Sequence, residues 1–381
     1  MTVGKPGFVA GRLNERQREK LILGVAAPLL ALLTAMAITS LVMVVTGDNP
    51  FTAFSVMFDF GIKSDSQVWI INKAIPYYLS AVAVAIGFRM NLFNIGVDGQ
   101  YRVAAFFAAV VGGALSLPGF VQIPVILLVA MVCGGIWAGI AGYLKATRGV
   151  SEVITTIMLN FIAGSLIAYF LQEGRLAERE GNIVHTPDIP GSSYFFEFAT
   201  SVQPIHGTVL IAVLIGAAYW FVLTRTRFGF DLRAVGRSES AAEASGVSVT
   251  RTVVTAMLLS GAVAGLVGMP TLLNESGNYG NDFPEGLGFT GIAIALLGRN
   301  HAIGMGFAAL LWAFLERTGT QLEFEGFDQE IVGVMQGVIV LSVVVAYELV
   351  RRWGVRRQQR LVGEKLAQAR KSDNDQAEVS A

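Results

Sequence analysis

A short polar segment interrupts apolar stretches that are long enough to span a membrane. Residues 93–100 read Phe-Asn-Ile-Gly-Val-Asp-Gly-Gln, so the side chains of Asn94, Asp98 and Gln100 stand beside two glycines. A polar side chain at membrane depth is unfavourable by a few kcal/mol unless it is paired or hydrated. Non-helical backbone at that depth is tolerated where it borders protein or a water-filled cavity. The segment therefore predicts a re-entrant or broken helix beside a solute pathway, with hydrogen bonding between helices as the alternative role.

A second polar group has the spacing of one helix face. Ser151 is the expected N-cap of this helix. Four polar residues follow it at nearly helical spacing: Glu152, Thr155, Thr156 and Asn160. The neutral members of the stripe suit a hydroxylated, uncharged solute better than an ion. Hydrogen bonding between helices is again the alternative.

Two further polar residues, Arg299 and Asn300, lie between a short apolar segment and the next long one. We include both among the candidate pathway residues. The neighbouring His301 stands beside an arginine at the end of a span, which is typical of an interfacial residue, while a proton relay is the alternative function.

The sequence indicates neither catalysis nor a metal centre. Its single cysteine, Cys133, excludes an intramolecular disulfide, a Cys-based zinc site and an iron–sulfur cluster, and the three histidines are far apart. Gly-x-Ser-x-Gly and His-Glu-x-x-His motifs are absent, which argues against an intramembrane enzyme. No Walker A loop is present, so the usual route of ATP hydrolysis is missing. We expect no catalytic residue, no metal and no cofactor.

The elements that must position these residues are membrane helices. The 381 residues are 53% hydrophobic and 15% charged, which is too apolar for a water-exposed surface. A helix of about 20 residues crosses the hydrocarbon core. Hydropathy predicts ten spans, at about 21–45, 68–88, 95–115, 121–144, 152–172, 206–224, 252–272, 287–298, 303–319 and 330–350. The first is too long for a cleaved signal peptide and is expected to be a retained anchor, and the eighth is too short to span alone.

The distribution of basic residues predicts the orientation of the chain. With both termini in the cytoplasm, most of the 28 Lys and Arg residues fall on the cytoplasmic side, as basic residues near span ends do. The formal net charge of zero argues against nucleic-acid binding. We predict a cytoplasmic tail at 1–20, a membrane domain at 21–351 and a largely disordered cytoplasmic tail at 352–381. The external stretch 172–204 is expected to be a short lid or docking surface.

The arrangement of the spans resembles that of transporters. The third and eighth segments occupy matching places in two five-span halves, and both are short or interrupted by glycine. Two copies of an odd number of spans must be inverted relative to each other, which is typical of transporters. Glycines at Gly135-x-x-x-Gly139 and Gly261-x-x-x-Gly265 predict close helix packing, with sliding of the helices as a further possible role.

The longest internal connection, residues 225–251, predicts a short cytoplasmic helix on a basic platform. Ser240-x-x-Glu243 has the form of a capping box, the alanines that follow favour helix, and Gly246 suits the C-terminus. A solvated loop is the alternative. A capped helix with small Ala and Ser side chains could also lie in a groove of a partner protein.

Four stretches of the sequence resemble the permease subunits of bacterial ABC importers for simple sugars and nucleosides, within the ribose and branched-chain amino-acid permease group. They are Phe93 to Gln100, Gly149 to Ala163, Arg227 to Arg251 with the following Ser-Gly-Ala-Val-Ala-Gly, and Gly288 to Asn300. Asp98 and Val97 depart from the Glu and Ala expected for the family, and Ser238 stands where Asn is usual.

The resemblance implies an all-α permease of the type II importer class in the bacterial cytoplasmic membrane. Its expected partners are cytoplasmic ATP-binding subunits, a second permease subunit, the same or related, and an extracytoplasmic solute-binding protein. ATP hydrolysis would take place in the partner, not in this chain. By analogy the ATPase contact would comprise Arg233, Gly236, Ser238, Ala241, Ala242, Glu243 and Gly246. Purine nucleosides are the favoured cargo, simple sugars the alternative, and an ion-coupled secondary transporter the rival function.

Overall fold

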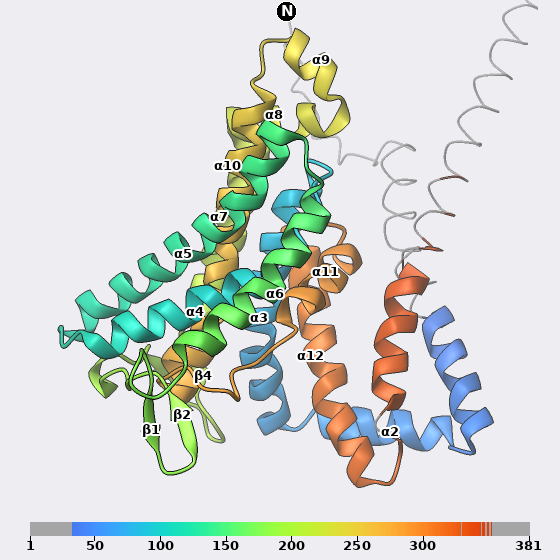
Figure 1. Ribbon diagram of the computed structural model, residues 1–381. Helices are drawn as coiled ribbons and strands as arrows, with labels where there is room; N and C mark the ends of the chain where they lie inside the picture. Colours follow the sequence, from blue (N-terminus) through green and yellow to red (C-terminus); the bar gives the residue numbers. More distant parts are fainter. Residues whose placement is uncertain (1–32, 329, 344, 347–348, 350–351, 353–381) are drawn as a thin grey trace, which may run out of the picture. The chain divides into compact units, whose positions relative to one another are not determined.

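The computed structural model of the protein describes residues 33–328, 330–343, 345–346, 349 and 352 (Figure 1). The predictions for the tail at 1–20, for the start of the first span and for almost all of the tail at 352–381 lie outside these residues. The chain divides into two compact units, residues 1–51 with 330–381, and residues 52–329. In the first unit the described residues form the helices Leu33–Thr46 and Glu330–Val343.

The second unit, residues 52–329, is mostly helical and contains all the candidate site residues. Its helices are α2 (Pro50–Gly61, which begins in the first unit), α3 (Ser64–Phe88), α4 (Val97–Ala114), α5 (Gly119–Arg148), α6 (Glu152–Phe170), α7 (Val209–Arg225), α8 (Arg227–Arg237), α9 (Glu239–Ala244), α10 (Val249–Gly265), α11 (Leu287–Leu297) and α12 (Ala302–Phe324). A π-helical segment, η2 (Thr271–Ser276), follows α10. The predicted spans within this unit agree with these helices to within a few residues, apart from 252–272, which divides between α10 and η2. Helix α2 was not predicted.

Length and composition alone identify only some of these helices as membrane spans. Among the described residues, three helices, α3, α5 and α6, are long and apolar enough to cross a bilayer, and there are up to five spans if two bent helix pairs are counted. One of these pairs is α7 with α8, which meet at an angle of 72°. The shorter apolar helices α10 and α11 fall below this length. The chain is therefore a mostly helical membrane protein, and ten crossings in two inverted halves remain a prediction.

Helix α3 is the centre of this unit. In its most apolar stretch 78% of the residues are buried, against 28% for α5 and 22% for α6. Helices α4, α7, α10, α11 and α12 all pack against α3. The outer faces of α5 and α6 instead carry exposed apolar side chains such as Ile136, Phe161 and Ile162. These faces are suited to lipid or to another apolar surface.

Glycines allow α5 and α10 to pack closely. A Cβ atom at Gly134 would overlap the carbonyl oxygen of Gly261, and one at Gly265 would overlap the carbonyl oxygen of Ala130. The backbones therefore approach within the space that a side chain would occupy. The close packing predicted from Gly261-x-x-x-Gly265 is confirmed.

Residues 178–206 form two short antiparallel ribbons that the helical prediction did not include. Strand β1 (Glu178–Glu180) pairs with β2 (Ile183–His185), and β3 (Glu197–Phe198) pairs with β4 (Ile205–His206). The connection between the ribbons is bonded to the segment after α10: Thr186 N–H donates to Tyr279 O at 3.0 Å and Phe195 N–H to Leu273 O at 2.9 Å. Figure 1 shows the β1–β2 ribbon at the end of this unit opposite α9. The stretch expected to be a lid is thus ordered and attached to the helices.

Candidate functional site

The break between α3 and α4 is held by a buried network of neutral polar side chains. Asn94 Nδ2 donates to Gln100 Oε1 at 3.0 Å and to Ser260 Oγ at 2.8 Å, and Gln100 Nε2 donates back to Asn94 Oδ1 at 2.8 Å. The N–H of Gly96 also donates to Asn94 Oδ1, at 3.1 Å. Ser260 Oγ on α10 donates to Ala83 O on α3 at 2.7 Å. The network therefore ties the non-helical backbone at 92–96 to α3, α4 and α10.

Asn160 connects the polar stripe of α6 to the same break. Its Oδ1 accepts from the N–H of Gly99 at 2.9 Å, and its Nδ2 donates to Ile95 O at 3.1 Å. The hydroxyls of Thr155 and Thr156 instead donate to carbonyls of their own segment, those of Ser151 and Val153. Asn160 thus reaches the break by hydrogen bonds, and the two threonines do not.

Glu152 forms a largely buried ion pair where α5 turns into α6. Its Oε2 lies 3.0 Å from Lys145 Nζ, and only 10% of its side chain is exposed. Its Oε1 accepts a long hydrogen bond, 3.5 Å, from the N–H of Phe93. Ser151 stands at the N-cap position as predicted, but its hydroxyl does not cap the helix.

Asp98 joins the two short segments predicted to correspond in the two halves. It lies in the first turn of α4, and its Oδ1 accepts from the N–H of Gly288 at the start of α11, at 3.3 Å. A Cβ at Gly288 would overlap the backbone of Asp98, so the two helix starts are in contact. Arg102, one turn further along α4, pairs with Glu285 at 2.5 Å. The carboxyl group of Asp98 therefore lies where the starts of α4 and α11 meet.

Arg299 and Asn300 form a tight turn between α11 and α12. Both have left-handed backbone conformations, with φ of 57° and 52°. The carbonyl of Asn300 accepts from Arg89 Nη2 at 2.6 Å and from Tyr219 Oη at 2.7 Å. Asn300 Oδ1 is buried without a hydrogen-bond partner. The turn therefore joins the ends of α3 and α7.

Helix α8 rests on the turn that follows α3. Asn91 Nδ2 donates to Gly236 O at 2.7 Å, and a Cβ at Gly236 would lie 2.8 Å from the Cα of Met90. Arg233, on the same helix, donates to the carbonyl of Leu223 on α7. The bend between α7 and α8 is capped by Thr226 Oγ1, which accepts from the N–H of Gly229. Helix α8 is thus in direct contact with the α3–α4 connection.

The short helix predicted in the 225–251 connection is present as α9, but its cap differs from the prediction. Ser238, not Ser240, is the N-cap, and its Oγ accepts from the N–H of Ala241. The helix begins two residues earlier than the capping box implied, so Glu243 lies beyond the position from which it could close that box. At the C-terminus Gly246 has φ of +80°, and the N–H groups of Gly246 and Val247 donate to Glu243 O and Ala242 O. This is a Schellman motif.

Most residues of α9 and of its C-terminal turn are exposed at the surface. Ala242 is buried, while Ala241, Glu243 and Gly246 are exposed. Its small exposed side chains allow close approach of another protein surface.

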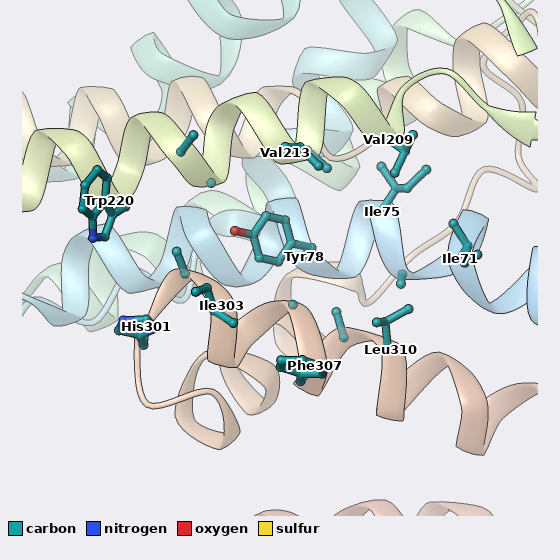
Figure 2. Close-up of a pocket in the computed structure, with 17 residues that line it drawn as sticks. Ile71, Ile75, Tyr78, Val209, Val213, Trp220, His301, Ile303, Phe307 and Leu310 are labelled. Carbon is teal, nitrogen blue, oxygen red and sulfur yellow. The ribbon is translucent and has the colours of Figure 1, made fainter. Parts of the chain in front are cut away.

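Two cavities lie beside these elements and largely avoid the predicted pathway residues. An apolar groove of about 720 Å³ runs between α3, α7 and α12 (Figure 2). A smaller cavity of about 320 Å³ lies among Arg89, Tyr219, Arg233 and Asn300. Of the predicted pathway residues, Asn300 alone lines one of these two cavities.

Four residues that bond to the candidate site residues were not predicted from the sequence to do so: Ser260, Lys145, Arg89 and Tyr219. Ser260 had a detectable signal, a serine that begins the Ser-Gly-Ala-Val-Ala-Gly stretch of an apolar segment. Arg89 and Lys145 were counted only as charges that orient the chain. Nothing in the sequence pairs Tyr219 with residue 300, because the contact spans 81 positions.

The described fold has features suited to a membrane transport component: a break between helices at a buried polar network, two helices that meet at their starts, and a short exposed helix, α9. Residues 67–344 match the family model described as "Branched-chain amino acid transport system / permease component". The chain therefore belongs to this family of transport-system permeases.

Similar proteins of this family are ABC transporter permeases. The chain is 35% identical to the guanosine ABC transporter permease protein NupP of Bacillus subtilis, over 84% of this chain and 93% of that protein. It is 31% identical to the glucose ABC transporter permease protein TsgB13 of Haloferax volcanii, over 90% and 93% of the two chains. It is 30% identical to the nucleoside ABC transporter permease protein NupB of Lactococcus lactis, over 88% and 93%. No solved structure matches the chain significantly.

Membership of this family defines the class of protein. The chain is an integral membrane permease subunit of an ABC transporter, and it is a transport component rather than an enzyme. ABC permeases work with ATP-binding subunits and a substrate-binding protein, so partners of these two kinds follow from the family.

Proposed function

We propose that this chain is the permease subunit of an ATP-driven importer that moves nucleosides, purine nucleosides in particular, across the cytoplasmic membrane. The observation that carries the proposal is the 35% identity to a guanosine permease over nearly the whole of both chains. A second relative named for nucleosides supports it.

The proposed pathway follows the break between α3 and α4. Asn94, Asp98, Gln100, Glu152, Thr155, Thr156, Asn160, Arg299 and Asn300 are assigned to its wall. Hydrogen bonds already engage Asn94, Gln100 and Asn160, so we assign them to holding the shape of the wall. Selectivity is then supplied mainly by the solute-binding protein on the external side, and the permease transports by alternating access between two permease subunits.

The proposed coupling passes from α9 to the break. Its contact with the ATPase comprises Arg233, Gly236, Ser238, Ala241, Ala242, Glu243 and Gly246. Movement of α9 passes through Ser238, which ends α8 and caps α9. Helix α8 then moves the turn at 89–91 through the Asn91–Gly236 hydrogen bond. Three residues after Asn91, the chain enters the Asn94 network.

The test is uptake by the complete transporter. The chain is co-expressed with the ATP-binding subunit, the binding protein and any second permease encoded beside it, and uptake of labelled guanosine, glucose and ribose is measured. We expect ATP-dependent guanosine uptake that is lost in Glu243→Arg. Glu323→Arg, the same charge reversal at an exposed position of α12 in the same unit, is the matched control and should retain uptake.

The outcomes separate three functions. Uptake of glucose or ribose but not guanosine would show that the transported solute is a sugar. A sugar is the second candidate because the chain is 31% identical to a glucose permease. Uptake by this chain alone, driven by an ion gradient and indifferent to Glu243→Arg, would replace the importer by a secondary carrier.

A further inference from the structure

The apolar groove and the smaller cavity adjoin each other. Trp220, His301 and Ala302 line both of them. Figure 2 shows Trp220 and His301 at one end of the groove, beyond Tyr78, and Ile71 at the other end. An apolar part, the groove, and a polar part, the smaller cavity, are therefore next to each other.

The apolar part opens outward between helices. Apart from His301 and the polar tips of Tyr78 and Trp220, its lining consists of apolar side chains and glycines. Val213 on α7, and Ile303 and Phe307 on α12, are exposed at 62%, 67% and 71%. At Gly306 a Cβ would meet only the Tyr78 ring, at 3.8 Å, so the groove has free room there. Such a surface excludes water and suits a hydrocarbon chain.

The polar part is positively charged. Arg89 and Arg233 both line the cavity. Arg89 donates to the carbonyl of Asn300 and to the Tyr219 hydroxyl, and Arg233 donates to the carbonyl of Leu223. Within the described part of the chain neither guanidinium has a carboxylate partner, and the cavity is lined by no acidic residue. Neutral carbonyls thus position two charges that nothing in the site neutralises.

We propose that this site binds one anionic phospholipid, with the phosphate between Arg89 and Arg233 and an acyl chain in the groove between α3, α7 and α12. Basic pockets between membrane helices on the cytoplasmic side bind anionic headgroups, and both arginines lie on the side predicted to be cytoplasmic. Guanidinium groups form strong, charge-assisted hydrogen bonds with phosphate. Thr224 and His301 supply further polar groups. The proposal is independent of which solute is transported.

The position of this lipid site gives it a structural consequence. Arg233 lies on α8, just beyond the 72° bend from α7, and Arg89 lies in the turn on which α8 rests. A phosphate between them would connect the two segments. The lipid would then stabilise the arrangement through which α9 contacts the rest of this unit.

The test is lipid retention by the purified full-length chain, measured by native mass spectrometry. The probes are phosphatidylglycerol and phosphatidylcholine with identical acyl chains. We expect one retained phosphatidylglycerol and weaker retention of phosphatidylcholine. In Arg89→Gln/Arg233→Gln retention of phosphatidylglycerol should fall roughly tenfold or more, whereas Arg237→Gln, an exposed arginine of the same helix outside the cavity, should behave as the unmodified chain. Arg89→Lys/Arg233→Lys keeps the charge and should keep the preference.

The groove is tested separately. Gly306→Leu fills its free room and should lower retention of both lipids, while Gly164→Leu, on α6 where a Cβ meets nothing within 4 Å, should not. Three results would overturn the proposal: equal retention of the two lipids, unchanged retention of phosphatidylglycerol in a folded Arg89→Gln/Arg233→Gln variant, or full displacement of the lipid by inorganic phosphate. A change of oligomeric state in Gly306→Leu without loss of lipid would assign the groove to a second copy of the chain instead.

Discussion

At the scale of single residues, the break between α3 and α4 depends on buried polar groups that hydrogen-bond to one another. Asn94 alone engages the side chains of Gln100 and Ser260 and the N–H of Gly96. Asn94, Gln100 and Ser260 are each at most 1% exposed. A buried donor or acceptor that loses its partner destabilises a protein by about 1–3 kcal/mol. The network therefore stabilises this particular non-helical conformation of the backbone at 92–96.

Replacement of Asn94 is expected to destabilise the permease strongly. Asn94→Leu leaves Gln100 and the N–H of Gly96 buried without partners, so the unfolding temperature of the detergent-purified protein should fall by several degrees. Asn94→Leu/Gln100→Leu removes both amides and should be less destabilising than the two single changes together. Thermal unfolding of the three variants tests this, and strict additivity would contradict a shared network.

At the scale of elements, glycine determines how closely helices pack. Helix α5 approaches α10 because Gly134 and Gly261 face each other, and no side chain would fit at either position. We expect Gly261→Val to separate the two helices and reduce both membrane expression and thermal stability. Gly164→Val is the matched control, because a Cβ there meets nothing within 4 Å. Equal stability of the two variants, measured by fluorescence-detected chromatography after heating, would show that close α5–α10 contact is not required.

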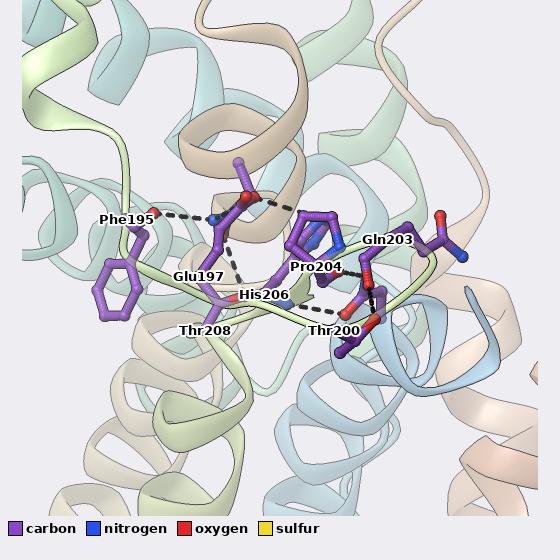
Figure 3. Close-up of polar contacts among 9 residues, drawn as sticks. Phe195, Glu197, Thr200, Gln203, Pro204, His206 and Thr208 are labelled. Atoms are coloured by element: carbon purple, nitrogen blue, oxygen red, sulfur yellow. Dashed lines mark hydrogen bonds and ion pairs between the residues drawn. The ribbon is translucent and has the colours of Figure 1, made fainter. Parts of the chain in front are cut away.

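The β3–β4 ribbon carries a titratable group whose environment favours its neutral form. His206 precedes α7, and burial lowers the pKa of its imidazole, although Glu275 and Glu197 act in the opposite direction. Its Nδ1 has no hydrogen-bond partner, and its Nε2 lies 3.9 Å from Glu197 Oε1. Figure 3 shows His206 beside Glu197 in the ribbon. Protonation is therefore unfavourable in the folded ribbon.

The ribbon should lose stability in mildly acidic solution. The unfolded ribbon binds a proton as the pH falls below about 6.5, whereas the folded one resists until the pH reaches its lower pKa. The stabilising contribution is thus fully present above about pH 6.5, the unfolded pKa, and is lost as the pH falls from there through the lower folded pKa. Hydrogen exchange in residues 202–206, corrected for the intrinsic pH dependence, should accelerate between pH 7.5 and 5.5. In His206→Gln this dependence should disappear, and its persistence would assign the effect to another group.

At the scale of the whole molecule, the proposed orientation requires α9 and the β1–β2 ribbon to face opposite sides of the membrane. The two elements lie at opposite ends of the unit formed by residues 52–329 (Figure 1). In a Cys133→Ser background, a membrane-impermeant maleimide applied to intact cells should label Glu180→Cys but not Ser240→Cys. Both positions are exposed, so accessibility within the protein is matched. Labelling of Ser240→Cys from outside would reverse the predicted topology.

Sequence patterns were enough to predict the class of this protein and most of its helices. Apolar segments of membrane length, the asymmetry of basic residues and the small residues at 134–139 and 261–265 are local signals, because each is read within one or two helix lengths. The polar residues at 94–100 and 152–160 could also be identified from the sequence, because they interrupt apolar segments and each group is local in the chain. Their partners could not: Asn94 meets Ser260, Asp98 meets Gly288 and Arg89 meets Asn300 across 166, 190 and 211 positions. The folded structure was needed to find these contacts, the ribbons at 178–206 and the two adjoining cavities, because each depends on how distant segments pack in space and leaves no periodic pattern in the chain.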